Sequence, residues 1–291
     1  MSEKKKSLQQ HQVTPVTENP WHKLNDFTDA RIGLGRAGVS VPTKHLLAFQ
    51  LAHAQAIDAV HSTLNIEKLT TDLNKLDWAQ ACAPDCAPLI LHSRAKDRAT
   101  YLQRPDYGRL LNPESAKKLD EHRVQNTPQY DLAIVVVDGL SSLAVEQNTL
   151  PFLQALQTYL VPNSVHPDNT WKLAPLCILE QGRVAIGDDV CERLHASCVL
   201  VLVGERPGLS SPDSLGLYLT WGGKVGLTDA YRNCISNIRP AGLSYQEAAR
   251  KAFYLLNEAH QLKLSGVNLK DRSDDDLINQ DRTTKNNFLI A

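Results

Sequence analysis

The sequence lacks the long apolar runs and the charge imbalance that mark membrane and nucleic-acid-binding proteins. No stretch approaches the roughly 18 consecutive apolar residues of a membrane-spanning helix. The 31 basic and 32 acidic side chains leave a net charge of −1, so no nucleic-acid or membrane partner is expected. The N-terminal MSEKKKSLQQHQ has lysines without a following apolar segment, so we expect no secretory signal and a cytoplasmic protein.

Cysteine is sparse, and its six positions form neither a disulfide framework nor a zinc motif. Cys82 and Cys86 are four residues apart, but no second pair and no nearby pair of histidines completes a tetrahedral site. We therefore expect reduced thiols and no metal site.

Complete nucleotide-binding motifs are also missing. No Gly-x-x-x-x-Gly-Lys-Ser/Thr occurs, which excludes a P-loop. GLGRAG at 33–38 matches Gly-x-Gly-x-x-Gly, but the preceding DFTDARI is too polar for a central strand, and no acidic residue follows at the end of a second strand. We interpret it as a glycine-hinged loop, with Arg31 and Arg36 facing a partner or an anion. The cobalamin motif Asp-x-His-x-x-Gly fails at His122, because Gln125 occupies its last position.

The chain has 291 residues, of which 42% are apolar, enough for one large or two ordinary folded domains. Residues 1–24 are polar and read as a flexible arm. Residues 25–125 read as a mostly helical N-terminal domain. Its main features are a long helix opened by Pro42, a shorter helix at 66–82 and a helix after Asn112-Pro113.

Strands and helices alternate over residues 126–268. The buried strands are predicted in DLAIVVV, KLAPLCILE, HASCVLVLVGE and LGLYLTW. The intervening helices are predicted at about 141–160, with a serine N-cap and an internal Pro151, and at about 188–196. A last helix starts at the capping box SYQE. This order predicts an α/β domain with a mainly parallel sheet covered on both faces. The polar tail, 269–291, is expected to be mobile.

The segment GERPG at 204–208 raises the question of function. The apolar run VLVLV ends at Val203, which places Glu205 and Arg206 at the carboxyl end of a strand, where open α/β sheets bind ligands. On the residues alone, a ligand site and a simple strand-ending turn are equally compatible. VDGLSS at 137–142 and GRVAIGD at 182–188 would end near the same edge, which favours one composite site. GRVAIGD also fits a hairpin turn with a short strand.

Six segments in order resemble the small (light) subunit of adenosylcobalamin-dependent ethanolamine ammonia-lyase, although each alone is only moderately specific. The resemblance implies a helical N-terminal domain followed by a Rossmann-like α/β domain, the same division that the periodicity indicates. The segments are RIGLGRAG at 31–38, HSRAKDRATYLQRPDYGRLL at 92–111, DLAIVVVDGLSSLAV at 131–145, GRVAIGD at 182–188, VGERPGLSSPDSLGLYLT at 203–220 and RNCISNIRPAGLSYQEAA at 232–249.

The resemblance also implies an activity and a partner. The family converts ethanolamine to acetaldehyde and ammonia through an adenosyl radical released from the cofactor. Its substrate-binding residues lie on a large subunit, so no catalytic residue is expected on this chain. Cobalamin sits between the two subunits and keeps its own base on cobalt, in agreement with the missing Asp-x-His-x-x-Gly. Many members are packaged in a bacterial microcompartment, but residues 1–18 show no clear amphipathic helix for such targeting.

Three cobalamin-contacting positions of the family correspond to Val184, Glu205 and Cys234. We expect Val184 to pack on the corrin edge or lower base, and Glu205 to accept hydrogen bonds from corrin side-chain amides. Cys234 would contact the cofactor or offer a weak S–H donor. A small buried structural cysteine is the alternative at that position. The alternative for the whole chain is a stand-alone module that binds a nucleotide or flavin at the same edge.

Overall fold

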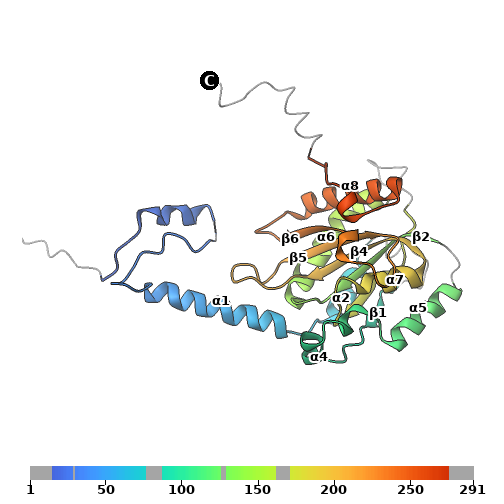
Figure 1. Ribbon diagram of the computed structural model, residues 1–291, viewed down its shortest axis with the longest axis horizontal. Helices are drawn as coiled ribbons and strands as arrows, with labels where there is room; N and C mark the ends of the chain where they lie inside the picture. Colours follow the sequence, from blue (N-terminus) through green and yellow to red (C-terminus); the bar gives the residue numbers. More distant parts are fainter. Residues whose placement is uncertain (1–14, 29, 77–86, 126–128, 162–170, 275–291) are drawn as a thin grey trace, which may run out of the picture. The chain divides into compact units, whose positions relative to one another are not determined.

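The computed structural model describes residues 15–28, 30–76, 87–125, 129–161 and 171–274. The chain divides into two compact units, Met1–Ala56 and Ile57–Ala291 (Figure 1). Within the described ranges, no helix combines the length and the hydropathy needed to span a bilayer.

The described part of the first unit before residue 43 consists of a short 3₁₀ helix and a loop closed by backbone hydrogen bonds. The 3₁₀ helix η1 (Pro20–Asp26) overlaps the end of the predicted flexible arm. Thr17 and Arg36 exchange two backbone hydrogen bonds of 2.7 and 2.9 Å, which fold GLGRAG back on the preceding chain. Gly33 has a φ of +63°, and a Cβ there would lie 2.7 Å from the backbone of His22. GLGRAG thus closes a loop, and it does not stand between a sheet strand and a helix.

Helix α1 (Thr43–His61) follows Pro42 directly, as the proline position predicts. Pro42 and Ala52 are the buried residues among those described before residue 57. Leu46, Leu47 and Leu51 share one side of α1, and all three are exposed. The first unit therefore has almost no core of its own and carries an apolar helix face that its own side chains leave open.

The second unit contains a six-stranded mixed sheet in the order β1-β3-β2-β4-β5-β6. The first four strands in this order are parallel, as predicted, whereas β5 and β6 are antiparallel to their neighbours. Only residues 205–214 join β4 to β5, too few for the crossover that a parallel neighbour requires. The strands are β1 (Leu89–His92), β2 (Tyr130–Val137), β3 (Cys177–Glu180), β4 (Ala196–Gly204), β5 (Leu215–Trp221) and β6 (Arg232–Ile238).

The predicted helical domain over residues 25–125 does not match the observed division of the chain. β1 lies within that range, yet it forms an edge of the sheet beside β3. Its four residues, LILH, are too short to show a strand period and are followed by charged side chains. Three of the α-helices described in this range lie wholly in the second unit: α2 (Ile66–Leu73), α4 (Arg98–Gln103) and α5 (Pro113–Gln125). Residues 77–86 lie outside the described ranges.

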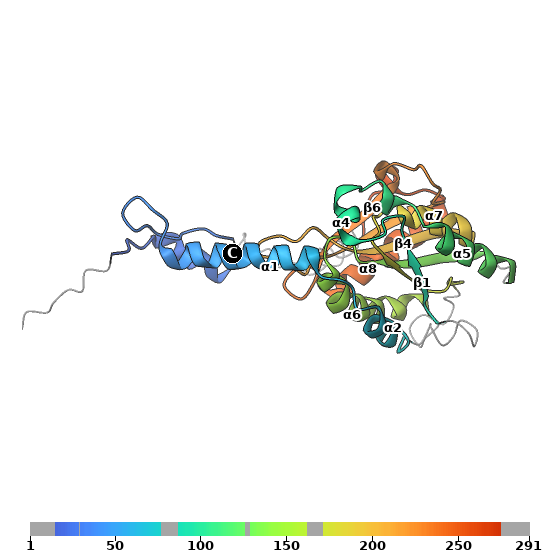
Figure 2. The same cartoon turned by 90° about the horizontal axis from the view of Figure 1, so that it is seen from below.

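Helices cover the sheet on both faces, as predicted. The apolar sides of α6 (Ser142–Leu160) and α8 (Tyr245–Leu262) pack on one face, and α7 (Ile186–Leu194) and α5 pack on the other. Figure 2 shows α2 and α6 on the opposite side of the sheet from α5 and α7. Pro151 lies inside α6, which continues as one helix. Three short 3₁₀ helices complete the fold: η2 (Tyr107–Arg109), η3 (Asp229–Tyr231) and η4 (Gly266–Asn268).

Predicted caps begin two of these helices. Ser141 Oγ accepts a hydrogen bond from the Ala144 N–H at 3.2 Å, and Ser244 Oγ accepts one from the Glu247 N–H at 3.3 Å. The Glu247 carboxylate pairs with Arg250 at 2.6 Å, so it does not complete the reciprocal capping box.

The first residues of the predicted mobile tail pack on the second unit. Leu269 and Ser273 are buried, and Asp274 forms ion pairs of 2.6 Å with Arg250 and 2.7 Å with Lys251 on α8. Residues 275–291 lie outside the described ranges.

A buried carboxylate ties the ends of β2 and β3 together. Asp138, directly after β2, is 2% exposed. Its two oxygens accept hydrogen bonds from the backbone N–H groups of Gln181 and Gly182, at 3.0 and 3.2 Å. Arg98 Nη1 lies 3.7 Å from Asp138 Oδ2 and donates to the Gly139 carbonyl at 2.8 Å. Burial raises the pKa of Asp138 to about 6, although these hydrogen bonds favour the charged form.

This raised pKa predicts a pH-dependent stability. The folded chain holds the Asp138 proton more tightly than the unfolded chain, so stability falls as the pH rises from about 4 to about 6. Asp138→Asn removes that contribution. Between pH 4 and pH 7 the difference in unfolding free energy between the native chain and the variant should change by roughly 2–3 kcal/mol. Urea unfolding followed by circular dichroism measures both profiles.

Asp131→Asn is the matched control, because Asp131 also accepts a backbone N–H, from Lys172 at 2.9 Å, but is less buried. Parallel stability profiles for the native chain and Asp138→Asn would show that Asp138 does not titrate in this window.

Candidate functional site

The parallel strands end at a topological switch point. From β2 the chain passes through α6 to β3 on one side, and from β3 it returns through α7 to β4 on the other side of β2. Such a point leaves a crevice beyond the carboxyl ends of the strands, where open α/β sheets bind ligands. A cavity of about 430 Å³ lies there, lined by residues that follow β2, β3 and β4.

Backbone at the ends of β2 and β4 forms part of the cavity lining, which we call its floor. The Leu140 N–H donates to the carbonyl of Gly204 at 2.8 Å, which joins the ends of β2 and β4. A Cβ at Gly139 would lie 2.3 Å from that carbonyl oxygen, and a Cβ at Gly204 would lie 2.0 Å from the carbonyl oxygen of Ser141. Only glycine allows this close approach at either position.

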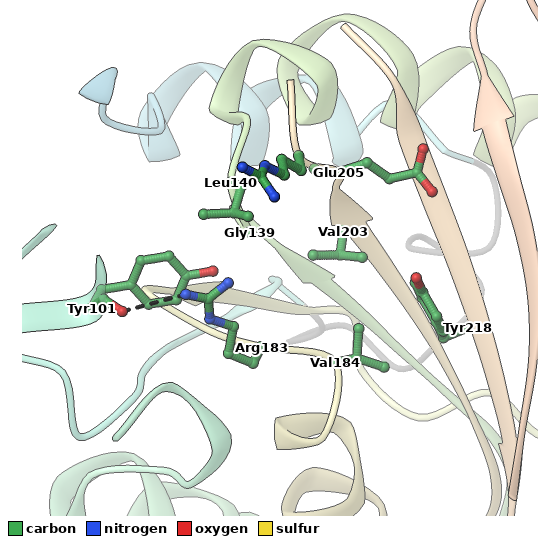
Figure 3. A pocket seen from close by; sticks show the side chains of 10 residues that line it. Tyr101, Gly139, Leu140, Arg183, Val184, Val203, Glu205 and Tyr218 are labelled. Carbon is green, nitrogen blue, oxygen red and sulfur yellow. Dashed lines mark hydrogen bonds between the residues drawn. The ribbon is translucent and has the colours of Figure 1, made fainter. Parts of the chain in front are cut away.

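Val184 forms part of one wall. The segment GRVAIGD makes a turn and then enters α7 at Ile186, so it is not a hairpin with a short strand. Val184 is half-buried and lies near Tyr218 of β5 across the cavity (Figure 3). After Val184, an ion pair ties the first turn of α7 to β6: the two guanidinium Nη atoms of Arg232 bind Asp188 at 2.8 and 2.7 Å.

Glu205 extends from the GERPG loop over the edge of the cavity. Its side chain is half-buried and points toward Tyr218 (Figure 3). One carboxylate oxygen, Oε2, accepts hydrogen bonds from the Ser214 hydroxyl and from the Asn237 N–H, the latter at 3.3 Å. The loop holds a carboxylate at the edge of the cavity. Oε1 takes part in neither of these hydrogen bonds, and a Cβ at Gly216 of β5 would lie 2.7 Å from it.

Cys234 lies beside the cavity, not in it. It is exposed and stands opposite Tyr218 in the β5–β6 register, so the two side chains share one sheet face. Tyr218 lines the cavity, whereas Cys234 does not. Its exposure contradicts the alternative of a buried structural cysteine. Desolvation by the surrounding chain raises the pKa of the Cys234 thiol, which keeps it protonated at neutral pH, and it also raises the pKa of Tyr218.

Sequence reasoning missed two residues of the opposite wall. Tyr101 belongs to α4, far from the other lining residues in the sequence, and its hydroxyl donates to the Gly182 carbonyl at 2.9 Å. Burial raises the pKa of Tyr101, so the hydroxyl remains a donor. Arg183 stacks on the Tyr101 ring, with its guanidinium carbon 4.2 Å from the ring centre. Arg183 stands beside Val184 in GRVAIGD, but nothing in that pattern marks its side chain as a cavity residue.

Metal-binding side chains do not gather within the described ranges. No group of three or more His, Cys, Asp or Glu residues there could hold a metal ion. The pair Cys82 and Cys86 lies outside those ranges.

Comparison with known proteins identifies the family. Residues 18–270 match the ethanolamine ammonia-lyase light-chain family. An ethanolamine ammonia-lyase small subunit of Pseudomonas paraeruginosa is 49% identical over 281 residues, which cover 97% of this chain and 98% of that protein. Small subunits of the same enzyme from Azotobacter vinelandii and Pseudomonas fluorescens are each 50% identical, over 96% and 95% of this chain and 98% and 95% of theirs.

These matches include the described part of the first unit from residue 18, the strands of the sheet and the cavity between their ends. The chain therefore belongs to the ethanolamine ammonia-lyase small-subunit family, whose members form a lyase with a partner subunit.

Proposed function

We propose that this chain supplies one side of an adenosylcobalamin site in an ethanolamine ammonia-lyase. The observation that carries the proposal is the cavity at the switch point, because Val184 and Glu205 line it and Cys234 lies on the adjoining sheet face. The second unit acts in this proposal as a Rossmann-like cofactor-binding domain. The enzyme converts ethanolamine to acetaldehyde and ammonia.

The residues present fit part of a corrinoid. Val184 and the ring of Tyr218 offer apolar contacts to a flat macrocycle, and Glu205 Oε1 offers an acceptor for the N–H groups of its amide side chains. The backbone floor at Gly139 and Gly204 allows close approach. A cobalamin is much larger than the ligands that cavities of roughly 300–1,000 Å³ enclose. This chain therefore covers only one part of the cofactor.

In this proposal the cofactor supplies the chemistry, and this chain supplies residues that bind it. When bound, adenosylcobalamin supplies radical chemistry by homolysis of its cobalt–carbon bond. The chain's own residues bind and orient: Glu205 fixes amide side chains, Val184 packs against an apolar edge, and Cys234 contributes a protonated thiol on the adjoining sheet face. Base-on binding requires no histidine from this chain, and no catalytic residue is assigned to it.

The other side of the site belongs, in this proposal, to the large subunit. The relatives are named small subunits, which implies a larger partner. The exposed side of α1, formed by Leu46, Leu47 and Leu51, offers an apolar face for that partner, and it lies within the part of the chain that the family match covers. The active enzyme is thus a hetero-oligomer.

Activity should depend on both subunits. This chain alone is expected to produce no acetaldehyde from ethanolamine, and the chain combined with the large subunit and adenosylcobalamin is expected to turn over. A coupled assay that reduces the acetaldehyde with alcohol dehydrogenase measures the product. No acetaldehyde from the reconstituted pair would refute the proposal. Calorimetric binding of a nucleotide or a flavin to the isolated chain would support the stand-alone module instead.

Glu205→Gln should weaken corrinoid binding. The substitution retains the shape of the side chain but removes the charge and replaces one acceptor with a donor. Loss of one hydrogen bond to a charged group costs roughly 1.5–3 kcal/mol, which corresponds to about a ten- to hundredfold higher Kd. The Kd for cyanocobalamin, measured by absorbance titration of the reconstituted complex, provides the readout.

Glu192→Gln is the control for the lost charge. Glu192 lies on α7 away from the cavity lining and accepts a backbone hydrogen bond from Val225 at 3.3 Å. We expect its Kd to match that of the native complex. An unchanged Kd for Glu205→Gln would remove Glu205 from the cofactor site.

A further inference from the structure

Arg183 is held in one orientation in the cavity wall. Its backbone N–H donates to the Gly108 carbonyl at 2.7 Å. Its guanidinium stacks on the ring of Tyr101, and Nη2 donates to the Tyr101 carbonyl at 3.4 Å. Figure 3 shows this guanidinium beside the tyrosine at one end of the cavity. The contacts fix the cation before any ligand binds.

No acid in the described part of the chain balances this cation. Nε of Arg183 is buried without a hydrogen-bond partner there, and none of the ion pairs found among the described residues includes Arg183. The buried Asp138 already accepts hydrogen bonds from two backbone N–H groups and faces Arg98. Arg98 also lies 4.8 Å from the centre of the Tyr101 ring, but Asp138 offsets its charge. The protein itself thus leaves part of the hydrogen-bonding capacity of this Arg183 guanidinium unused.

The cavity is polarised from end to end. Arg183 stands at the Tyr101 end, and the carboxylate of Glu205 stands at the Tyr218 end (Figure 3). Glu205 is engaged by the Ser214 hydroxyl and by the Asn237 N–H. Arg206, a second and more exposed guanidinium, also lines the cavity. A neutral ligand would leave the Arg183 charge without a partner, so the site favours a ligand with an anionic group.

We propose that Arg183, assisted by Arg206, binds the phosphodiester of cobalamin, an inference that rests on the proposed function. The phosphodiester, which joins the nucleotide to the corrin, is the anionic group among the amides that surround the macrocycle. A guanidinium offers two parallel N–H donors that match two phosphate oxygens. Glu205 would then bind the neutral amide groups of the ligand at one end of the cavity, and Arg183 would bind its phosphate at the other end.

Ligands that differ by the phosphate test this assignment. Cobinamide lacks the phosphate and the nucleotide, and cobinamide phosphate restores the phosphate alone. In the reconstituted complex, Arg183→Gln should raise the Kd for cyanocobalamin and cobinamide phosphate about ten- to a hundredfold. It should change the Kd for cobinamide less than about threefold. Absorbance titration measures all three values without turnover.

Arg94→Gln is the matched control, because Arg94 is exposed and lies outside the cavity lining. An equal loss for all three corrinoids with Arg183→Gln would assign Arg183 a purely structural role, and no loss for any of them would exclude it from the site. Arg183→Lys retains charge but not the paired donors, so we expect an intermediate Kd for the two phosphate-bearing ligands. Failure of the native complex to bind any corrinoid would instead refute the proposed function.

Discussion

The carboxylate of Asp138 is the contact on which the geometry of the cavity depends. It is buried after β2, where it receives the backbone N–H groups of Gln181 and Gly182 and faces Arg98. These bonds set the path of the chain between β3 and α7, and therefore the positions of Arg183 and Val184. A buried charge is costly unless it is paired and hydrogen-bonded. The neighbourhood of Asp138 meets that condition, at the expense of a raised pKa.

In the proposed function, the cavity forms only one part of a cofactor site. Its backbone floor and both polar ends come from this chain, yet the adjoining sheet face at Cys234 is exposed. The described residues of the first unit bury hardly any side chains. Small units with little buried apolar surface seldom order without outside contacts. Both features fit a subunit that functions only in an assembly.

Much of this arrangement follows from local sequence signals. The apolar runs that become β2 and β4, the caps at Ser141 and Ser244, and the turn at Gly204 were predictable because each depends on neighbouring residues. The sequence did not predict the direction of β5 and β6 or the presence of the short strand β1. These features depend on which strands pair with one another in the folded sheet. Val184 and Cys234 were singled out by the family resemblance alone, whereas Glu205 was also indicated by its place after β4. Arg183 was not predicted, because the sequence does not show whether an arginine has an acidic neighbour in the fold. Tyr101, on which its guanidinium stacks, comes from a distant helix.

The glycine contact between the ends of β2 and β4 has a consequence for recognition. Because Gly139 and Gly204 lie against neighbouring carbonyl groups with no room for a side chain, the floor has little freedom to rearrange. A ligand that contacts this floor does not have to order a mobile loop there, so little binding free energy is spent on restricting the motion of the protein. Discrimination between ligands then falls to the side chains around the rim, such as Arg183 and Glu205.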